Sequence, residues 1–247
     1  TVLEDENARW GAVVVLDVET GETLALVSEP AFNPHRFNES RKEDRRNRCI
    51  SQLFEPGSTF KAITLAACLD KGLASPEEII DCENGKLTVG KSTFSDWKPF
   101  DDLSVADVIV FSSNTGTIKL GSRLGGAGIT DFARQLGFGR MRFPNLPGAE
   151  PGYIREQDRW TPTAVASLSI GYGVAVTPVQ LAVAYATIAN GGKSISPTIL
   201  FNPTHESKRI MRPETAEAVR MILSEAVSRG TGKAARPDGY TAGGKTG

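Results

Sequence analysis

The sequence is poor in the residues that most often mark metal sites and histidine-dependent catalysis. Its 247 residues include only three cysteines, Cys49, Cys68 and Cys82, and two histidines, His35 and His205. The odd cysteine count, without a CxxC spacing, argues against a zinc site and against a disulfide framework, so we expect the three thiols to be buried as small hydrophobic groups. A catalytic triad would need one of the two histidines, and neither lies near an obvious nucleophile in the sequence.

Long apolar runs and an excess of one charge are also missing. No run approaches the roughly 18 apolar residues of a membrane span, and no signal peptide is visible. The 28 basic and 29 acidic residues give a net charge of −1, which excludes bulk attraction to nucleic acid or anionic lipid. The length fits one large domain or two intimate subdomains. Because the chain opens at Thr1 and stops inside GGKTG, we expect both ends to be cuts in a longer protein.

The hydrophobic pattern predicts strands near both ends and helices between them. Residues 10–30 hold two apolar runs around a turn, which predicts a hairpin, and the first run is so continuously apolar that we expect both faces of this sheet to be covered. Residues 239–247 predict the start of a strand. Helices are predicted at residues 58–72, 104–126 with a break at SSNTG, 129–137, 177–191 and 212–230. This order favours an α+β or α/β sheet with a helical insertion.

Three short motifs carry the chemistry. Residues 54–61 read FEPGSTFK, in which Ser58 and Lys61 are almost one helical turn apart and face the same side. Taken alone, this pair is equally an N-cap serine followed by a solvated lysine. SSN at Ser112–Asn114 alone could be an ordinary helix break. Together with KTG at Lys245–Gly247, however, they form the ordered set SxxK, SxN and KTG of the penicillin-recognising serine enzymes.

Longer segments extend this similarity over nearly the whole chain. RNRCISQLFEPGSTFK, LSVADVIVFSSNTGTIKL, SIGYGVAVTPVQLAVAYATIANGG and GTGKAARPDGYTAGGKTG resemble the transpeptidase domain of class B penicillin-binding proteins, in particular the septal, division-specific branch. The resemblance implies a penicillin-binding/β-lactamase-like transpeptidase fold, with an antiparallel sheet flanked by helices and an all-helical subdomain. Residues 1–247 would form one transpeptidase domain, incomplete at its C-terminus, with its sheet part at about 8–50 and 192–247 and its helical part at about 51–191.

The resemblance also assigns catalytic roles. Ser58 would be acylated by the D-Ala-D-Ala end of a peptidoglycan stem peptide, with Lys61 as the base, and Ser112 would relay a proton to the leaving group. Asn114 would hold Lys61 and the substrate amide, and Lys245 would tune the serine pair. Lys61 can act as a base only when neutral, far below its usual pKa near 10.4, and burial together with a second cation would lower that pKa.

Substrate binding would involve the last motif. Lys245 and Thr246 would bind the terminal carboxylate of the substrate, and Gly247 and Ser113 would complete the binding set. β-Lactam antibiotics would acylate Ser58 as substrate mimics, and no cofactor or metal is implied. In the family, the residue after KTG supplies one donor of the oxyanion hole, so we expect the stretch that stops at Gly247 to be poorly active by itself, with reduced stability.

Other readings of the same motifs stay open. A D,D-carboxypeptidase, β-lactamase or esterase would share them and differ only in the acyl acceptor, and a β-lactam sensor or a silent scaffold domain belongs to a different class of protein. For the parent protein, the resemblance implies an N-terminal transmembrane anchor absent from this sequence and a domain at the periplasmic, extracytoplasmic face of the bacterial inner membrane. Its partners would be a membrane glycosyltransferase and division proteins. The basic run at residues 41–48 would tie a loop to the body of the domain rather than bind phosphate.

Overall fold

A β-hairpin and a group of buried helices make up the computed structural model, which describes residues 2–143, 145–155, 160–201 and 207–247. The helices are α1 (Val2–Asp5), α2 (Arg48–Ser51), α3 (Lys61–Asp70), α4 (Val105–Val110), α5 (Asn114–Gln135), α6 (Pro162–Ser169), α7 (Pro178–Ala189) and α8 (Pro213–Ser228). The strands are β1 (Gly11–Leu16), β2 (Thr23–Glu29), β3 (Ile79–Asp81), β4 (Lys86–Val89), β5 (Ser92–Ser95), β6 (Asp102–Ser104), β7 (Tyr153–Ile154) and β8 (Val174–Ala175).

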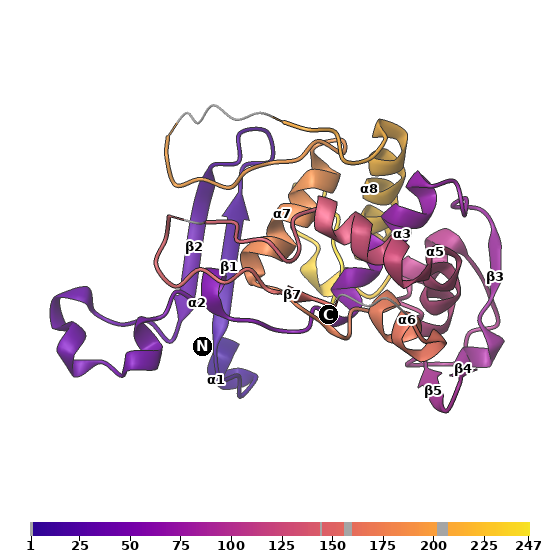
Figure 1. Ribbon diagram of the computed structural model, residues 1–247, viewed down its shortest axis with the longest axis horizontal. Coiled ribbons are helices and arrows are strands. Elements are labelled where there is room, and N and C mark those ends of the chain that lie inside the picture. Colours follow the sequence, from indigo (N-terminus) through magenta and orange to yellow (C-terminus); the bar gives the residue numbers. More distant parts are fainter. Residues whose placement is uncertain (1, 144, 156–159, 202–206) are drawn as a thin grey trace.

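The hairpin and most of the helices lie at opposite ends of these elements. Figure 1 shows the β1–β2 hairpin on one side, α7 next to it, and α3, α5, α6 and α8 on the other side. The strands of the described part pair antiparallel in twos, as β1–β2, β3–β6, β4–β5 and β7–β8. This mixture of helices and antiparallel strands is the class that the sequence predicts. No helix in the described ranges is both long and apolar enough to cross a bilayer.

The hairpin confirms one prediction and corrects another. β1 and β2 pair as expected, and the face that carries Val14 and Leu26 packs on α2 and α7. On the opposite face, however, the side chains of Val13, Val15 and Val27 are about half exposed (53%, 42% and 46%). The prediction that both faces are covered is therefore wrong for the described chain. An apolar run shows that a strand can be buried on both faces, but tertiary neighbours decide whether it is.

The helical core surrounds α3. Every residue from Lys61 to Leu69 is buried, as the all-round apolar pattern predicts, and Gly72 ends the segment with φ +66°. α5, α4 and α8 pack against it. The two helices predicted at residues 104–126 and 129–137 are divided differently in the structure: α4 ends before SSN, and α5 runs on to Gln135 through a non-helical Gly125.

α7 and α8 follow their sequence signals closely. The Thr177 hydroxyl accepts a hydrogen bond from the N–H of Gln180, and the Gln180 side chain accepts one from the N–H of Thr177, which completes the predicted capping box. α8 buries one face, including Val219 and Leu223, as its amphipathic pattern predicts. Both helices therefore support the centre of the molecule.

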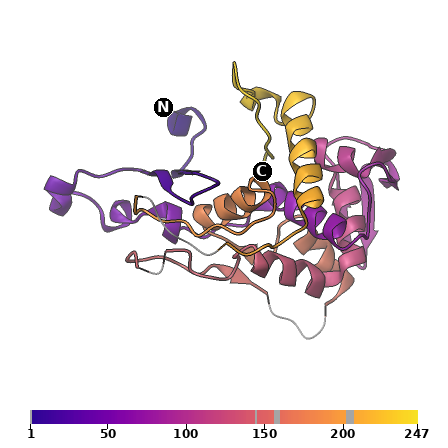
Figure 2. The same ribbon diagram turned by 90° about the horizontal axis from the view of Figure 1, so that it is seen from above.

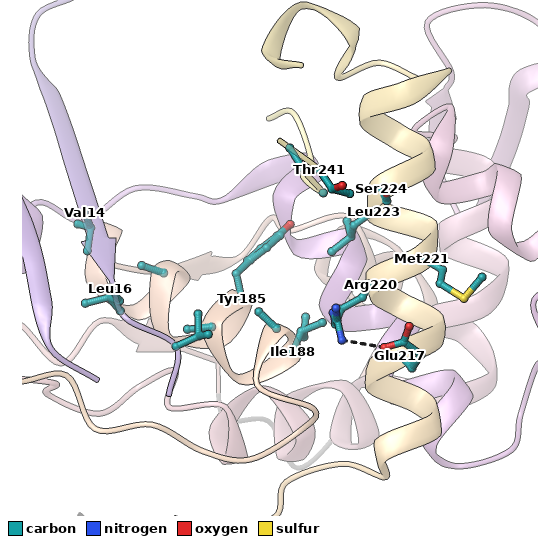
Figure 3. A pocket seen from close by; sticks show the side chains of 16 residues that line it. Val14, Leu16, Tyr185, Ile188, Glu217, Arg220, Met221, Leu223, Ser224 and Thr241 are labelled. Atoms are coloured by element: carbon teal, nitrogen blue, oxygen red, sulfur yellow. Dashed lines mark hydrogen bonds and ion pairs between the residues drawn. The ribbon is translucent and has the colours of Figure 1, made fainter. Parts of the chain in front are cut away.

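The C-terminal segment 241–247 is not a strand, contrary to the prediction. The backbone N–H of Gly244 in this segment donates a hydrogen bond to the Leu223 carbonyl of α8 (3.1 Å). A cavity of about 640 Å³ lies between this segment and β1, and Figure 3 shows Val14 on one side of it and Tyr185 of α7 along it. A strand requires a hydrogen-bonded neighbour, and here β1 lies across the cavity. Figure 2 shows the segment returning beside α8, apart from the hairpin.

The basic run contributes to structure, as expected. The Arg46 guanidinium donates to the carbonyl of Ser51 (3.1 Å), and the nearly buried Arg48 donates to the carbonyl of Glu43 (3.1 Å) and lies 3.6 Å from the Asp44 carboxylate. These contacts join the loop of residues 31–47 to α2.

Candidate active site

Ser58 lies in a tight turn that the loop after α6 supports. Residues Gly57–Phe60 form a 3-10 turn that leads directly into α3, and Gly57 has φ +53°. The N–H of Gly57 donates to the carbonyl of Gly171 (3.2 Å). A Cβ at Gly171 would lie only 2.2 Å from the carbonyl oxygen of Gly57, and the φ of Gly171 is +86°, so this close approach requires glycine. The position of the Ser58 turn therefore depends on a loop more than a hundred residues away.

The hydroxyl of Ser58 is not used as a helix cap. The N-cap position of α3 is Phe60, which makes no side-chain capping bond. In the turn itself the Thr59 hydroxyl donates to the carbonyl of Pro56 (2.6 Å). Within the described ranges, the side chain of Ser58 and its backbone N–H both lack a hydrogen-bond partner. The N-cap alternative is therefore wrong, and both groups are available to an incoming molecule.

Lys61 is completely buried, with 0% of its surface exposed. Its Nζ lies 2.7 Å from the carbonyl oxygen of Ser112, 3.2 Å from the hydroxyl oxygen of Ser112 and 2.6 Å from Oδ1 of Asn114. The fold thus joins the first two motifs, although they are about fifty residues apart in the sequence. The alternative of a solvated lysine is wrong.

Burial lowers the pKa of Lys61 from its ordinary value of 10.5 to about 7. The value of about 7 also includes the positive charge of Lys245, which lowers the pKa, and the negative charge of Asp96, which raises it. The hydrogen bonds suit either protonation state. Two partners of Nζ are carbonyl-type oxygens that can only accept, so a neutral amine donates to both and directs its lone pair at the Ser112 hydroxyl. Ser112 then donates to neutral Lys61 and accepts from charged Lys61, as a proton relay requires.

Ser112 occupies a strained turn between α4 and α5. Its φ of +60° is unusual for a residue other than glycine. The next residue, Ser113, caps α5, because its hydroxyl accepts from the N–H of Gly116 (3.0 Å). Ser113 has 0% of its surface exposed. The structure therefore gives Ser113 a structural role as the cap of α5, and its part in substrate binding stays a prediction.

Two neighbours orient the amide of Asn114. Its Oδ1 accepts from Lys61 Nζ, and its Nδ2 donates to the carbonyl oxygen of Ser95 (2.7 Å). A carbonyl can only accept, so the nitrogen must face Ser95 and the oxygen must face Lys61. The side chain is therefore fixed with its acceptor toward the amine.

The third motif lies beside the first. Gly247 approaches the Ser58 turn, since a Cβ built on it would lie 3.3 Å from the methyl carbon of Thr59. Nζ of Lys245 donates to the carbonyl oxygen of Thr246 (2.9 Å), and the Thr246 hydroxyl is 2.9 Å from that of Thr231. Burial lowers the pKa of Lys245 to about 8. A cavity of about 490 Å³ reaches both Thr59 and Lys245, so the motif borders open space.

Sequence reasoning missed several supporting residues. Asp96 accepts hydrogen bonds from the start of α5, the Tyr185 hydroxyl donates to the carbonyl of Thr59 (2.7 Å), and Gly171 contacts Gly57. No local pattern marks Asp96 or Tyr185, because each acts on a residue distant in the sequence. Only the glycine, in a GYG sequence after a helix, carried a turn signal.

In the described part of the chain, no cysteine or histidine side chain forms a hydrogen bond with Ser58 or Lys61. Cys49, Cys68 and Cys82 are free and buried, as predicted. His35 lies in the loop of residues 31–47, and His205 is outside the described residues. In the described ranges no group of three or more histidine, cysteine or acidic side chains could hold a metal ion.

Comparisons with known proteins agree with this geometry. Residues 11–247 match the family model of the penicillin-binding protein transpeptidase domain. The chain is 36% identical to the probable peptidoglycan D,D-transpeptidase PenA of Neisseria meningitidis over 99% of its length and 42% of that protein. It is 31% identical to the peptidoglycan D,D-transpeptidase FtsI of Escherichia coli, over 98% of the chain and 41% of that protein. It thus spans about two fifths of these relatives.

Solved structures show the same fold. The apo transpeptidase domain of Burkholderia pseudomallei penicillin-binding protein 3 superposes with a TM-score of 0.88 at 33% identity, covering 98% of this chain and 70% of that one. The predicted transpeptidase fold is therefore confirmed. Since the family model covers nearly all of the chain, and the SxxK, SxN and KTG motifs meet around one buried lysine, the chain belongs to the class B penicillin-binding protein transpeptidase domains.

Proposed function

We propose that this domain is a penicillin-sensitive serine D,D-transpeptidase that cross-links peptidoglycan stem peptides through an acyl-enzyme on Ser58. The observation that carries the proposal is Lys61: a completely buried amine with a pKa of about 7, in contact with the Ser112 hydroxyl and one turn from Ser58. A serine hydroxyl is a weak nucleophile at neutral pH, and such an amine is the base that it needs.

In the first half-reaction, the Ser112 hydroxyl turns away from the lone pair of neutral Lys61. The amine then accepts the Ser58 proton while Oγ of Ser58 attacks the carbonyl carbon of the penultimate D-alanine. The developing oxyanion meets the unpaired N–H of Ser58 at the start of the 3-10 turn. The C–N bond of the substrate then breaks, and Ser112 passes the proton held by Lys61 to the departing nitrogen of the terminal D-alanine. This leaves an ester on Ser58 and a neutral lysine.

In the second half-reaction, the amine of another stem peptide attacks that ester. The amine loses a proton through Ser112 and Lys61, and the proton returns to Oγ of Ser58 as the ester bond breaks. Lys245 and Thr246 bind the carboxylate of the first substrate, which suits a cation and a hydroxyl beside the Ser58 turn. Asn114 keeps its oxygen on Lys61 and offers its amide edge to the substrate backbone.

The cellular setting belongs to the same proposal. The similarity to proteins named peptidoglycan D,D-transpeptidase supports a role in wall synthesis. As the family resemblance implies, we place this role in cell division, in a longer protein anchored in the inner membrane with this domain in the periplasm. The partners would be a membrane glycosyltransferase, which makes the glycan strands, and division proteins. β-Lactams would acylate Ser58 as mimics of D-Ala-D-Ala.

Mass spectrometry of the full-length protein after treatment with penicillin tests the nucleophile. We expect one adduct, on the tryptic peptide that contains Ser58, and none in Ser58→Ala. Ser51→Ala, which changes a buried serine on α2, is the matched control and should keep the adduct. An adduct at any other residue would overturn the assignment.

The acyl acceptor separates this function from its alternatives. With a D-Ala-D-Ala peptide and a D-amino acid as amine acceptor, a transpeptidase forms the exchanged peptide, whereas a carboxypeptidase or β-lactamase forms only the hydrolysed acid. A sensor stays acylated and releases neither product. Exclusive hydrolysis, or an adduct that never turns over, would contradict the proposed transfer.

A further inference from the structure

One short segment holds both sides of the strained turn at Ser112. Residues 95–97, which are the last residue of β5 and the two after it, lie against the break between α4 and α5. Before the turn, Nε1 of Trp97 donates to the carbonyl oxygen of Phe111 (2.9 Å). After it, Nδ2 of Asn114 donates to the carbonyl of Ser95. The segment thus spans the residue that would relay the proton.

Asp96 makes the strongest part of this contact. Its carboxylate accepts four hydrogen bonds: from the hydroxyl of Ser113 (2.8 Å), the N–H of Asn114, and the N–H (3.1 Å) and hydroxyl (2.9 Å) of Thr115. Ser113 and Thr115 are fully buried. Each carboxylate oxygen thus has two donors from the first residues of α5. A negative charge at a helix N-terminus is also stabilised by the helix dipole.

This arrangement bears on the reacting groups. A residue with φ +60° that is not glycine persists only where its surroundings hold it. Ser112 and Asn114 supply all three hydrogen-bond partners of Lys61, and Asp96 holds the backbone that carries them.

We propose that Asp96 is a positioning residue for acyl transfer: its carboxylate fixes the turn that presents Ser112 and Asn114 to Lys61, and its charge acts on the Lys61 amine. This rests on the proposed function of Ser58 and Lys61. The Asp96 carboxylate makes no hydrogen bond to Lys61 Nζ, whose partners are Ser112 and Asn114, so it acts through the turn and through its charge.

The two charged side chains that act on Lys61 change its pKa in opposite directions. Lys245, from the C-terminal segment, lowers the pKa of Lys61, and Asp96, from the segment after β5, raises it. Asp96 also faces the buried thiol of Cys82, whose pKa is raised mainly by burial, while Lys119 lowers it. Removing the charge of Asp96 therefore lowers the pKa of Lys61.

The test is acylation of the full-length protein by a fluorescent penicillin as a function of pH. Asp96→Asn keeps the shape of the side chain and removes its charge and two acceptor sites. We expect the plateau rate constant to fall about tenfold or more, because small displacements of catalytic groups cost large factors. The midpoint of the acid limb should move down by about half a pH unit or more. Asp101→Asn, an exposed aspartate nearby, should change neither quantity.

Trp97→Phe separates positioning from charge. It removes the Nε1–H bond to Phe111 and keeps an aromatic ring beside Phe100 and Lys98, so the plateau rate should fall while the midpoint stays in place. If Asp96→Asn does not fold, this variant decides the positioning half of the proposal, and an unchanged rate would overturn it.

The possible failures can be told apart. If the wild-type protein is not acylated at Ser58, the proposed function is wrong. If it is acylated, and Asp96→Asn keeps the plateau rate of the wild type, the function stands and the role of Asp96 in positioning is overturned. If the plateau falls but the midpoint does not move, the action of its charge on Lys61 is overturned.

Discussion

The rate of acylation of Ser58 should follow the titration of Lys61. Only the neutral amine can accept the Ser58 proton, and its pKa is about 7. Below this value the rate should fall about tenfold per pH unit, to about one hundredth of its plateau at pH 5. Above about pH 8, Lys245 loses the proton that makes it a carboxylate ligand, so the rate should fall again. The profile is a narrow bell.

The size of the effect follows from the burial of Lys61. With the ordinary pKa of 10.5, roughly 3 amines in 10,000 would be neutral at pH 7, whereas a pKa of about 7 leaves about half of them neutral. This gain of about a thousandfold corresponds to roughly 5 kcal/mol of preference for the neutral form. The removal of water from the completely buried amine is the largest cause of this preference, and the positive charge of Lys245 adds to it.

Stopped-flow measurement with a fluorescent penicillin from pH 5 to 9.5 gives this profile directly. Lys61→Arg should abolish acylation, because a guanidinium does not lose its proton in this range. Lys86→Met, at an exposed lysine on β4, is the control and should leave the bell unchanged. A rate that is flat from pH 5 to 8, or a midpoint near 10, would show that Lys61 is cationic in the resting protein and would refute the reasoning.

The same pKa predicts an effect on stability. The pKa of Lys61 is lower in the folded than in the unfolded chain, so its contribution to stability is present above about pH 10.5 and is lost as the pH falls toward 7. Lys61→Met lacks this titration. The free energy of unfolding of wild type minus that of the variant should therefore rise by about 3 kcal/mol between pH 7 and 9.5. A difference that does not vary with pH would contradict the lowered pKa.

Two further predictions concern the support of the Ser58 turn. Gly171→Ala should lower both the melting temperature and the acylation rate, because its Cβ would lie 2.2 Å from the Gly57 carbonyl oxygen. Gly173, with φ +76° but open space around it, is the control. Gly173→Ala should keep the acylation rate and lower the free energy of unfolding by only about 1–2 kcal/mol through backbone strain. Equal loss of rate in both variants would exclude that contact as the support. Tyr185→Phe should lower the free energy of unfolding, measured in urea titrations, by about 1–3 kcal/mol, because the carbonyl of Thr59 loses its hydrogen-bond donor. An unchanged midpoint of the urea transition would show that water replaces the hydroxyl.

Local patterns determined much of the secondary structure. The capping box of α7, the all-round burial of α3 and the amphipathic face of α8 all follow from residues within one or two turns of each other, and each is present as predicted. The three motifs also led to the proposed chemistry from the sequence alone, since Ser58, Lys61 and the SxN and KTG motifs form a combination that rarely occurs by chance.

Only the tertiary structure decided the state of Lys61 and the surroundings of the turn. The pKa of an amine depends on the water removed from it and on charges brought near it, and here these come from α5, from Asp96 and from Lys245, up to 184 residues along the chain. The exposed outer face of β1 and the unpaired segment 241–247 were likewise beyond the sequence pattern, because an apolar run does not specify its neighbours. Burial and charge depend on contacts between distant residues, whereas helix periodicity and capping depend on adjacent ones.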